Sequence, residues 1–461
     1  MKKLILVIGL GGVAMALTGV QHQAWSEDVA APSAAALEKG DVEQRLRILG
    51  RKLEIADETA AAKAGETVTL SAGPEGFQIQ SADKNFRLKF RLLLQADGRF
   101  FIDDDAGSQT NAFLIRRLRP ILEGTLFGFT SFRIAPDFAS NAKNVLYDAY
   151  LDIAPWTFAK LRVGKFKPPI GLEHLQSDEY LIFAERAFPS DLVPSRDTGL
   201  QLFGDLWGGA VSYAAALTNG VGDNNVNTTA TAPITSDTDN NDSKEGTARL
   251  AIKPFKNSAS GALQGLGLGL AGSYAKQATV NPNYVSPGLM VIFTPLATAA
   301  PDGEHSRLAP DIHWHFHSLG LYGEVIQSNQ VWRVGAVRKN IVNTAWVTAG
   351  SYVLTGEDAS FTGVKPRKPF NVQNHTWGAV ELAARYQELY LDPDSFTTTS
   401  PITTAATSVQ RAQSYGVGVN WYLSSAVRLT TGFDATSFDK GAASGDRPNE
   451  KIVISRWQLV F

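Results

Sequence analysis

The chain has 461 residues, of which 44% are hydrophobic and 19% charged, and its net charge is -2. A mean hydropathy of -0.10 is too low for a bundle of membrane helices. Beyond the N-terminus no apolar run reaches the roughly 18 residues that a spanning helix needs. The absence of cysteine excludes disulfides and thiol chemistry. The 41 glycines, 24 phenylalanines and 9 tryptophans favour many short strands, tight turns and aromatic girdles.

Residues 1–26 have the pattern of an export signal. Lys2 and Lys3 precede an apolar core from Leu4 to Val20, and Ala24 to Ser26 offers a small-residue cleavage site. The alternative, a retained membrane anchor, is disfavoured because the core is short and a polar segment follows it. The prediction is therefore an exported protein.

Residues 27–40 are predicted to be a linker, and residues 41–64 a helix. An apolar stripe recurs at alternating spacings of four and three, which is a heptad pattern; its members are Val42, Leu46, Leu49, Leu53, Ala56 and Ala60. Fewer than three heptads are marginal as an isolated helix. We expect a short periplasmic coiled coil joining several copies, and the alternative is an amphipathic helix that packs on its own domain.

From residue 76 to the C-terminus the hydrophobic period becomes two, which predicts strands. Phe86, Leu88 and Phe90 lie on one face, whereas Arg87, Lys89, Arg91 and Arg99 lie on the other. The predicted strands are Phe86–Arg99, Leu114–Phe127, Thr130–Phe138, Val145–Ile153, Lys160–Phe166, Val211–Leu217, Thr247–Lys253, Leu266–Tyr274, Gly320–Gln327, Ala345–Leu354, Trp377–Tyr386, Ser414–Tyr422, Val427–Phe433 and the last eleven residues. Together with weaker segments, they indicate an all-β fold, an antiparallel transmembrane barrel of about 16 strands with an aqueous lumen.

The end of the chain and the gaps between strands support a barrel. The last strand alternates Val453, Trp457 and Leu459 with Arg456 and Gln458, and it ends on the aromatic Phe461. Long polar segments are predicted to be external loops, namely Asp223–Glu245, Val280–Leu308 and Phe396–Val409. Short segments such as Ala154–Trp156 and Leu423–Ser425 are predicted to be periplasmic turns. A soluble solenoid or sandwich would also alternate, but it would not explain an aromatic terminus combined with an export signal.

Motifs for catalysis or cofactors receive little support. Gly267–Gly272 matches a dinucleotide-binding pattern but lies within an alternating strand with no following helix, so we reject it. His313, His315 and His317 could share a strand face and chelate a metal, although Pro310 and the sequence after His317 indicate a strand end. No nucleophile elbow, zinc-protease motif or phosphate-binding loop is present. We expect no enzymatic activity, no metal and no cofactor.

The clearest functional pattern is basic. Arg87, Lys89, Arg91 and Arg99 share one strand face, and Arg117 and Arg119 lie on the next strand, with Arg116 on its opposite face or at a bend. Guanidinium groups bind phosphate or carboxylate bidentately, and charged rings select ions in pores. These groups either form a free ladder for anions or pair with Asp97, Glu123, Asp137, Asp148 and Asp152.

An ordered series of motifs over about residues 85–461 resembles the phosphate-selective porin O/P family. The matching runs are Ile115–Arg119, Leu122–Leu126, Tyr147–Tyr150, Leu161–Pro169, Gly171–Glu173, Glu185–Arg186, Pro194–Arg196, Leu354–Glu357, Gly378–Tyr386, Gly418–Tyr422, Arg456, Gln458 and Phe461.

This resemblance implies a 16-stranded homotrimeric anion porin. It implies an inward constriction loop within residues 167–197, and a periplasmic helical extension that helps to hold the trimer. It implies that Arg116, Arg117 and Arg119 lie on the anion path. From the basic strand face we add Arg87, Lys89 and Arg91 to this path, and from the loop Arg186 and Arg196. The same loop also carries six acids, Glu173, Asp178, Glu179, Glu185, Asp191 and Asp197, and a negative constriction would oppose anion entry.

The sequence therefore predicts a passive bacterial outer-membrane porin for phosphate or similar small oxyanions. Its expected partners are such anions, outer-membrane lipid, two further copies of the chain and the barrel assembly machinery through Phe461, with no nucleic acid. Alternatives are a general porin of low selectivity and a non-conducting structural or adhesive barrel. The small residues Gly267, Gly269, Ala271 and Ser273 on one strand favour an open lumen.

Overall fold

The computed structural model describes residues 44–45, 47–55, 58, 68–74, 76–102, 110–139, 146–220, 241–278 and 282–461. The predicted export signal and linker lie outside these residues. The described residues between 44 and 58 are helical, and Leu49 and Leu53 of the heptad stripe are exposed. Their pairing in a coiled coil remains a prediction. No described helix is long and apolar enough to cross a membrane.

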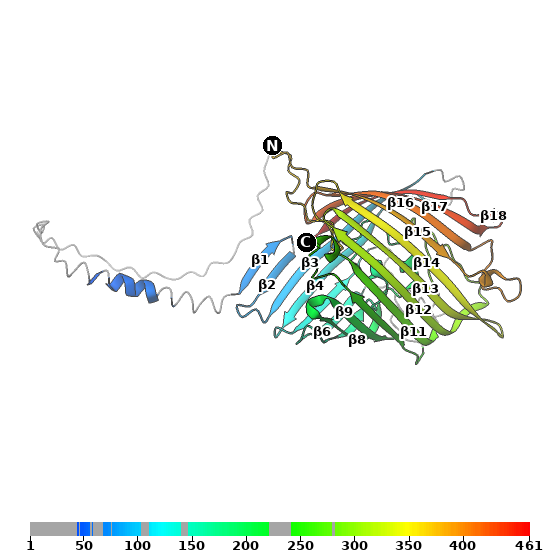
Figure 1. Ribbon diagram of the computed structural model, residues 1–461, viewed down its shortest axis with the longest axis horizontal. Helices are drawn as coiled ribbons and strands as arrows, with labels where there is room; N and C mark the ends of the chain where they lie inside the picture. Colours follow the sequence, from blue (N-terminus) through cyan, green and yellow to red (C-terminus); the bar gives the residue numbers. More distant parts are fainter. Residues whose placement is uncertain are drawn as a thin grey trace, which may run out of the picture. The chain divides into compact units, whose positions relative to one another are not determined.

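Residues from Thr69 onward form one continuous antiparallel sheet (Figure 1). Its strands are β1 (Thr69–Gly73), β2 (Gly76–Gln80), β3 (Arg87–Phe101), β4 (Ala112–Leu126), β5 (Thr130–Pro136), β6 (Leu146–Ile153), β7 (Lys160–Phe166), β8 (Asp197–Leu206), β9 (Val211–Thr218), β10 (Glu245–Ile252), β11 (Gly267–Ala278), β12 (Ala299–Phe316), β13 (Leu319–Val334), β14 (Val337–Val353), β15 (Ala379–Tyr390), β16 (Val409–Tyr422), β17 (Val427–Ala442), β18 (Gly445–Asp446) and β19 (Glu450–Val460). Short helices are α2 (Leu172–Leu175), α3 (Gly261–Gln264), η1 (Phe188–Leu192), η2 (Trp207–Gly209) and η3 (Pro393–Phe396).

The sheet closes on itself because β19 pairs with both β17 and β3. Within the described residues, β3 to β17 together with β19 make a closed barrel of 16 antiparallel strands, which confirms the predicted fold class. Closure satisfies the backbone groups that an open sheet would leave at its edges, as a membrane requires. Beyond the point where β19 ends, the hairpin β1–β2 continues along β3 at residues 87–90.

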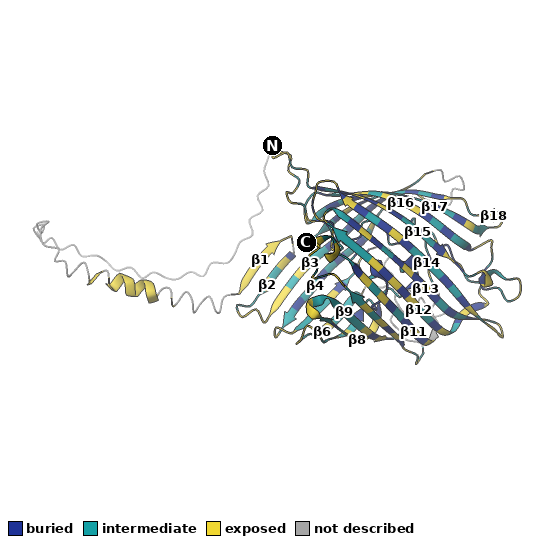
Figure 2. Ribbon diagram, viewed as in Figure 1, coloured by how far each residue is buried: buried dark blue, intermediate teal, exposed yellow. Residues whose placement is uncertain are grey.

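The two faces of the barrel wall differ as period two predicts (Figure 2). On β8 the outward Leu200 and Leu202 are about half exposed, whereas the inward Gln201 is buried. The same alternation places Asp97, Arg99 and Arg456 inside the barrel, where they are buried. Polar side chains therefore point into the lumen and apolar ones toward the surrounding lipid.

The structure differs from the sequence prediction in several places, and several strands are longer than predicted. The expected loop Val280–Leu308 is wrong at its end, because β12 already begins at Ala299, and a register shift between Pro301 and His305 hides the alternation. The strand β8 was missed. Finally, residues 354–378 form a long connection between β14 and β15 at the barrel end where short turns were expected.

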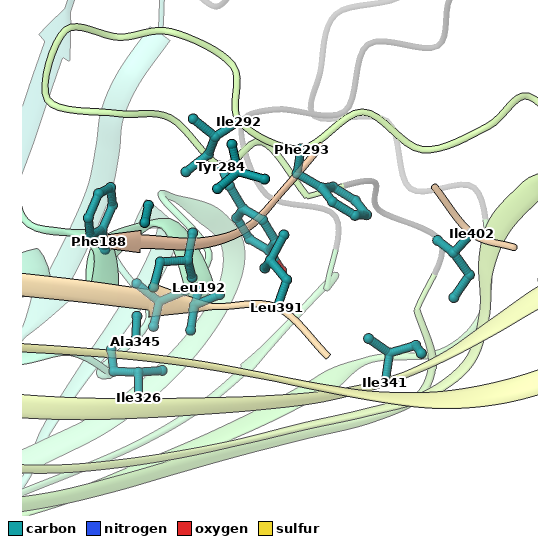
Figure 3. Packing of buried hydrophobic residues seen from close by; sticks show 14 of the residues in the cluster. Phe188, Leu192, Tyr284, Ile292, Phe293, Ile326, Ile341, Ala345, Leu391 and Ile402 are labelled. Atoms are coloured by element: carbon teal, nitrogen blue, oxygen red, sulfur yellow. The ribbon is translucent and has the colours of Figure 1, made fainter. Parts of the chain in front are cut away.

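A large apolar cluster lies inside the barrel, between the wall and the segments folded over it (Figure 3). Phe188 and Leu192 of η1 pack with Ile326 and Ala345 of the wall strands β13 and β14. Tyr284, Ile292 and Phe293 from the segment before β12, and Ile402 from the segment before β16, belong to the same cluster. Burial of these side chains fixes one side of the loop that contains η1.

Candidate functional site in the barrel lumen

The segment between β7 and β8, residues 167–196, lies inside the barrel and forms the candidate constriction. Its α2 helix is held by Glu324 of β13, which accepts hydrogen bonds from the backbone N–H groups of Leu172 (2.7 Å) and Glu173 (3.3 Å). On another wall, the Asn420 side chain donates to the carbonyl of Ile182 at 2.9 Å. Contacts to several strands thus hold this segment against the inner face of the wall.

A β-bulge places all three arginines of the Ile115–Arg119 motif toward the lumen. The pairing of β3 with β4 shifts register between Gln95, which pairs with Arg117, and Ala96, which pairs with Ile115. Arg116 is the extra residue, and the strand changes phase there. Arg116 consequently reaches the constriction loop, although strict alternation would have turned it toward lipid.

Glu185 of the loop is the centre of one buried charge cluster. Arg116 donates to it through Nε (2.8 Å) and Nη2 (3.0 Å), Arg99 through Nη2 (2.5 Å) and Arg456 through Nη2 (2.9 Å). Asp97 also pairs with Arg99 and Arg456. Burial would raise the pKa of Glu185, but the three arginines outweigh it and hold that pKa well below its usual value. This cluster contains three guanidinium groups and two carboxylates.

Asp178 is the centre of a second cluster. It forms ion pairs with Arg117 (3.3 Å), Arg119 and Arg186, and Arg119 also pairs with Asp137 at 2.7 Å. Burial opposes ionisation of Asp178, yet these neighbouring arginines keep its pKa well below the ordinary value. Again three guanidinium groups surround two carboxylates.

The remaining predicted path residues lie around these clusters. Arg91 pairs with Glu179 of the loop at 2.8 Å, and Arg196 pairs with Asp148 at 3.2 Å while its guanidinium stacks on the Tyr147 ring. Arg87 is exposed and donates to the Thr125 hydroxyl at 3.3 Å, and Lys89 is half-buried beside it on the same face. The structure thus brings six of the eight predicted residues to the loop, while Arg87 and Lys89 lie further along β3.

The loop acids are engaged by ion pairs and hydrogen bonds. Besides Asp178, Glu179 and Glu185, Glu173 accepts a hydrogen bond from the Tyr322 hydroxyl at 3.1 Å. Asp197 accepts from the backbone N–H of Gly220 at 2.6 Å. The negative charge of the loop is therefore balanced by arginines and hydrogen-bond donors, which the loop sequence alone did not reveal.

A cavity of about 480 Å³ lies between the loop and the wall strands β4 to β10. Its lining includes the basic residues Arg119, Arg133, Arg162, Lys167, Arg196 and Arg249 and the acids Asp148, Asp178, Glu179 and Asp205. Burial, reinforced by Arg186 and Arg196, holds the pKa of Lys167 well below its usual value. Arginines therefore supply the permanent positive charge of this cavity.

The histidine motif does not assemble a metal site. His313 and His315 lie near the end of β12, with ring centroids 6.0 Å apart, and both rings contact Phe361. His317 lies beyond the strand and is exposed next to Asp358. Across the described ranges, no group of three or more histidine or carboxylate side chains is arranged to hold a metal ion.

Comparison with known proteins identifies the family. The model of the family described as "Phosphate-selective porin O and P" matches residues 86–461. The chain belongs to this family. It is therefore an outer-membrane porin channel of a bacterium. Porin O of Pseudomonas aeruginosa is 23% identical over 421 residues, which cover 84% of this chain and 91% of that protein.

Among solved structures, the outer membrane channel DcaP of Acinetobacter baumannii is similar in fold. It has a TM-score of 0.54 and 13% identity, and the match covers 84% of this chain and 99% of that one. This likeness shows a shared barrel fold.

Asp191 of the loop makes stability depend on pH. Its carboxylate accepts a hydrogen bond from the Val285 N–H at 3.0 Å, and burial raises its pKa to about 8. Because the folded state binds this proton more tightly than the unfolded state, Asp191 contributes its full stabilisation below about pH 4, the ordinary pKa of aspartate. This contribution is lost as the pH rises through the folded-state pKa of about 8. The Asp191→Asn side chain cannot ionise, so the variant should escape this loss. The loss amounts to at most about 1.4 kcal/mol of unfolding free energy per pH unit. The melting temperatures of variant and unmodified porin should therefore diverge in favour of the variant from pH 5 to about 8 and keep a constant difference above that. A difference that does not depend on pH would contradict the assignment.

Proposed function

We propose that this porin passes small anions preferentially, with phosphate or similar oxyanions as solutes. The supporting observation is the excess of guanidinium groups over carboxylates in the two clusters at the constriction loop. In addition, Arg99 Nε and Nη1 and Arg117 Nε are buried without a hydrogen-bond partner among the described residues. Such N–H groups are costly to leave unsatisfied, and an anion or water would satisfy them.

The mechanism we propose is diffusion along a fixed positive potential. Ion pairs to Asp178 and Glu185 hold the arginines in place, and the remaining positive charge raises the local anion concentration. Several weak sites along Arg91, Arg117 and Arg119 would permit both entry and exit. Salt weakens exposed charge interactions, so anion preference should fall at high ionic strength.

We also propose the assembly that the sequence suggested. Three copies would associate, the helix within residues 41–64 would lie in the periplasm and add to the contacts between them, and the signal of residues 1–26 would be removed on export. Phe461 would be recognised by the barrel assembly machinery.

Single-channel recording in planar bilayers tests the anion preference. In a chloride gradient, the reversal potential should show anion selectivity, and added phosphate should block chloride current in a saturable way. Arg117→Ala should weaken that block about tenfold, the effect of one lost hydrogen bond to a charged group. A cation-selective or phosphate-indifferent channel would contradict the proposal, and absence of conductance would favour a structural barrel.

A further inference from the structure

Part of the wall of the basic cavity is aromatic. Tyr150 of β6 and Phe203 of β8 line it and are each only half-buried. The guanidinium carbon of Arg162 lies 3.9 Å from the centroid of the Tyr150 ring and 5.1 Å from that of Phe203. Such cation–π contacts fix the guanidinium against both rings. Aromatic surface that remains accessible in a water-filled lumen is available to a flat apolar group.

Two arginines beside these rings each have an N–H donor that makes no hydrogen bond to the described residues. Arg162 uses Nε and Nη2 for Asp152, at 2.7 and 2.8 Å, and Arg133 uses Nη1 for Glu123 at 2.8 Å and lies with Nε 3.5 Å from Asp148. Among the described residues, Arg162 Nη1 and Arg133 Nη2 therefore have no hydrogen-bond partner. Their carboxylate partners hold both guanidinium groups in one orientation, so the free donors are positioned in advance for a carboxylate.

A buried carboxamide completes the site. Gln201 of β8 lies opposite Arg162 in the β7–β8 register, is only 7% exposed and lines the same cavity. Its Oε1 atom accepts no hydrogen bond within the described part of the chain. A buried acceptor without a partner is rare in folded proteins. It offers a place for a hydroxyl group of a ligand.

We propose that this wall is a subsite for planar aromatic carboxylates, and hydroxybenzoates in particular. The carboxylate binds Arg162 Nη1 and Arg133 Nη2, the ring lies against Tyr150 and Phe203, and a hydroxyl donates to Gln201 Oε1. The proposal rests on the anion-channel function, and it adds the solute class that the cavity selects. A compact oxyanion such as phosphate uses the arginines alone, whereas an aromatic carboxylate also uses the two rings. The volume of about 480 Å³ suits a molecule of this size.

The test measures block of chloride current in single channels by four probes: benzoate, 4-hydroxybenzoate, cyclohexanecarboxylate and phosphate. Benzoate and cyclohexanecarboxylate carry the same charge, but only benzoate is planar. Benzoate should reduce the chloride current by half at about a fivefold lower concentration than cyclohexanecarboxylate. This factor corresponds to the free energy of one aromatic contact. Phe203→Leu should abolish that preference. Gln201→Met should abolish any advantage of 4-hydroxybenzoate over benzoate.

Tyr415→Leu is the matched control, because Tyr415 is 63% exposed on the outward face of β16. This variant should behave as the unmodified porin with all four probes. If the channel is anion-selective but benzoate and cyclohexanecarboxylate block equally, the aromatic subsite is overturned and the anion-channel function stands. If the channel is not anion-selective, both are overturned.

Discussion

Glu185→Gln should destabilise the refolded porin by about 3 kcal/mol, because removing one partner of a buried ion pair leaves uncompensated charge. Arg99, Arg116 and Arg456 all donate to this carboxylate, and Asp97 would be the carboxylate left to Arg99 and Arg456. The loop should also lose the ion pairs of Glu185 to β3, β4 and β19, while the pairs of Glu179 and Asp178 to β3 and β4 remain. Guanidinium titration in detergent, followed by the mobility of folded and heated samples on gels, measures the change.

Asp205→Asn is the control for this substitution. Asp205 pairs with Lys160 at 3.2 Å, but its side chain is 44% exposed, and such pairs contribute about 0–1 kcal/mol. A Glu185→Gln variant as stable as Asp205→Asn would show that the cluster does not hold the loop. In channels that do fold, the substitution removes one negative charge from the constriction, so anion selectivity should increase.

The sequence predicted the barrel because alternation requires only neighbouring residues. It could not predict the charge clusters, because Arg456 and Glu185 are 271 residues apart and meet only after the barrel closes. The closing register, which places Arg456 opposite Asp97, depends on the stagger of all 16 strands rather than on any local pattern. Arg456 was recognised as inward-facing, but its partners were not.

The polarity of lumen-facing residues also explains why the start of β12 was predicted to be part of a loop. The start of β12 carries Asp302, Gly303 and Glu304, which are as polar as any loop, because that strand faces water on one side and changes register there. Arg116 could not be placed for a related reason. A bulge inserts one residue into the period of two, and the sequence does not show which residue is extra.

Gly164→Ala should prevent β7 from pairing with β6. Gly164 has φ = 127°, a conformation that costs other residues about 1–3 kcal/mol. An added Cβ would lie 2.2 Å from the carbonyl oxygen of Ala149 and 2.8 Å from Cα of Tyr150. Both atoms belong to the backbone of β6, so relief of the clash requires the strands to separate. We expect little or no folded band on unheated gels.

Gly246→Ala is the control, because it tests whether replacing any glycine of the barrel by alanine impairs folding. Gly246 lies on β10 without a positive φ, and the nearest atom to its added Cβ is 4.0 Å away. That variant should fold and melt as the unmodified porin does, whereas equal behaviour of the two variants would contradict the clash.

Gly164 lies between Arg162, which stacks on Tyr150, and Lys167, at the base of the constriction loop. The close approach of β6 and β7 at this glycine therefore sets both the pairing of the wall and the position from which the loop enters the lumen.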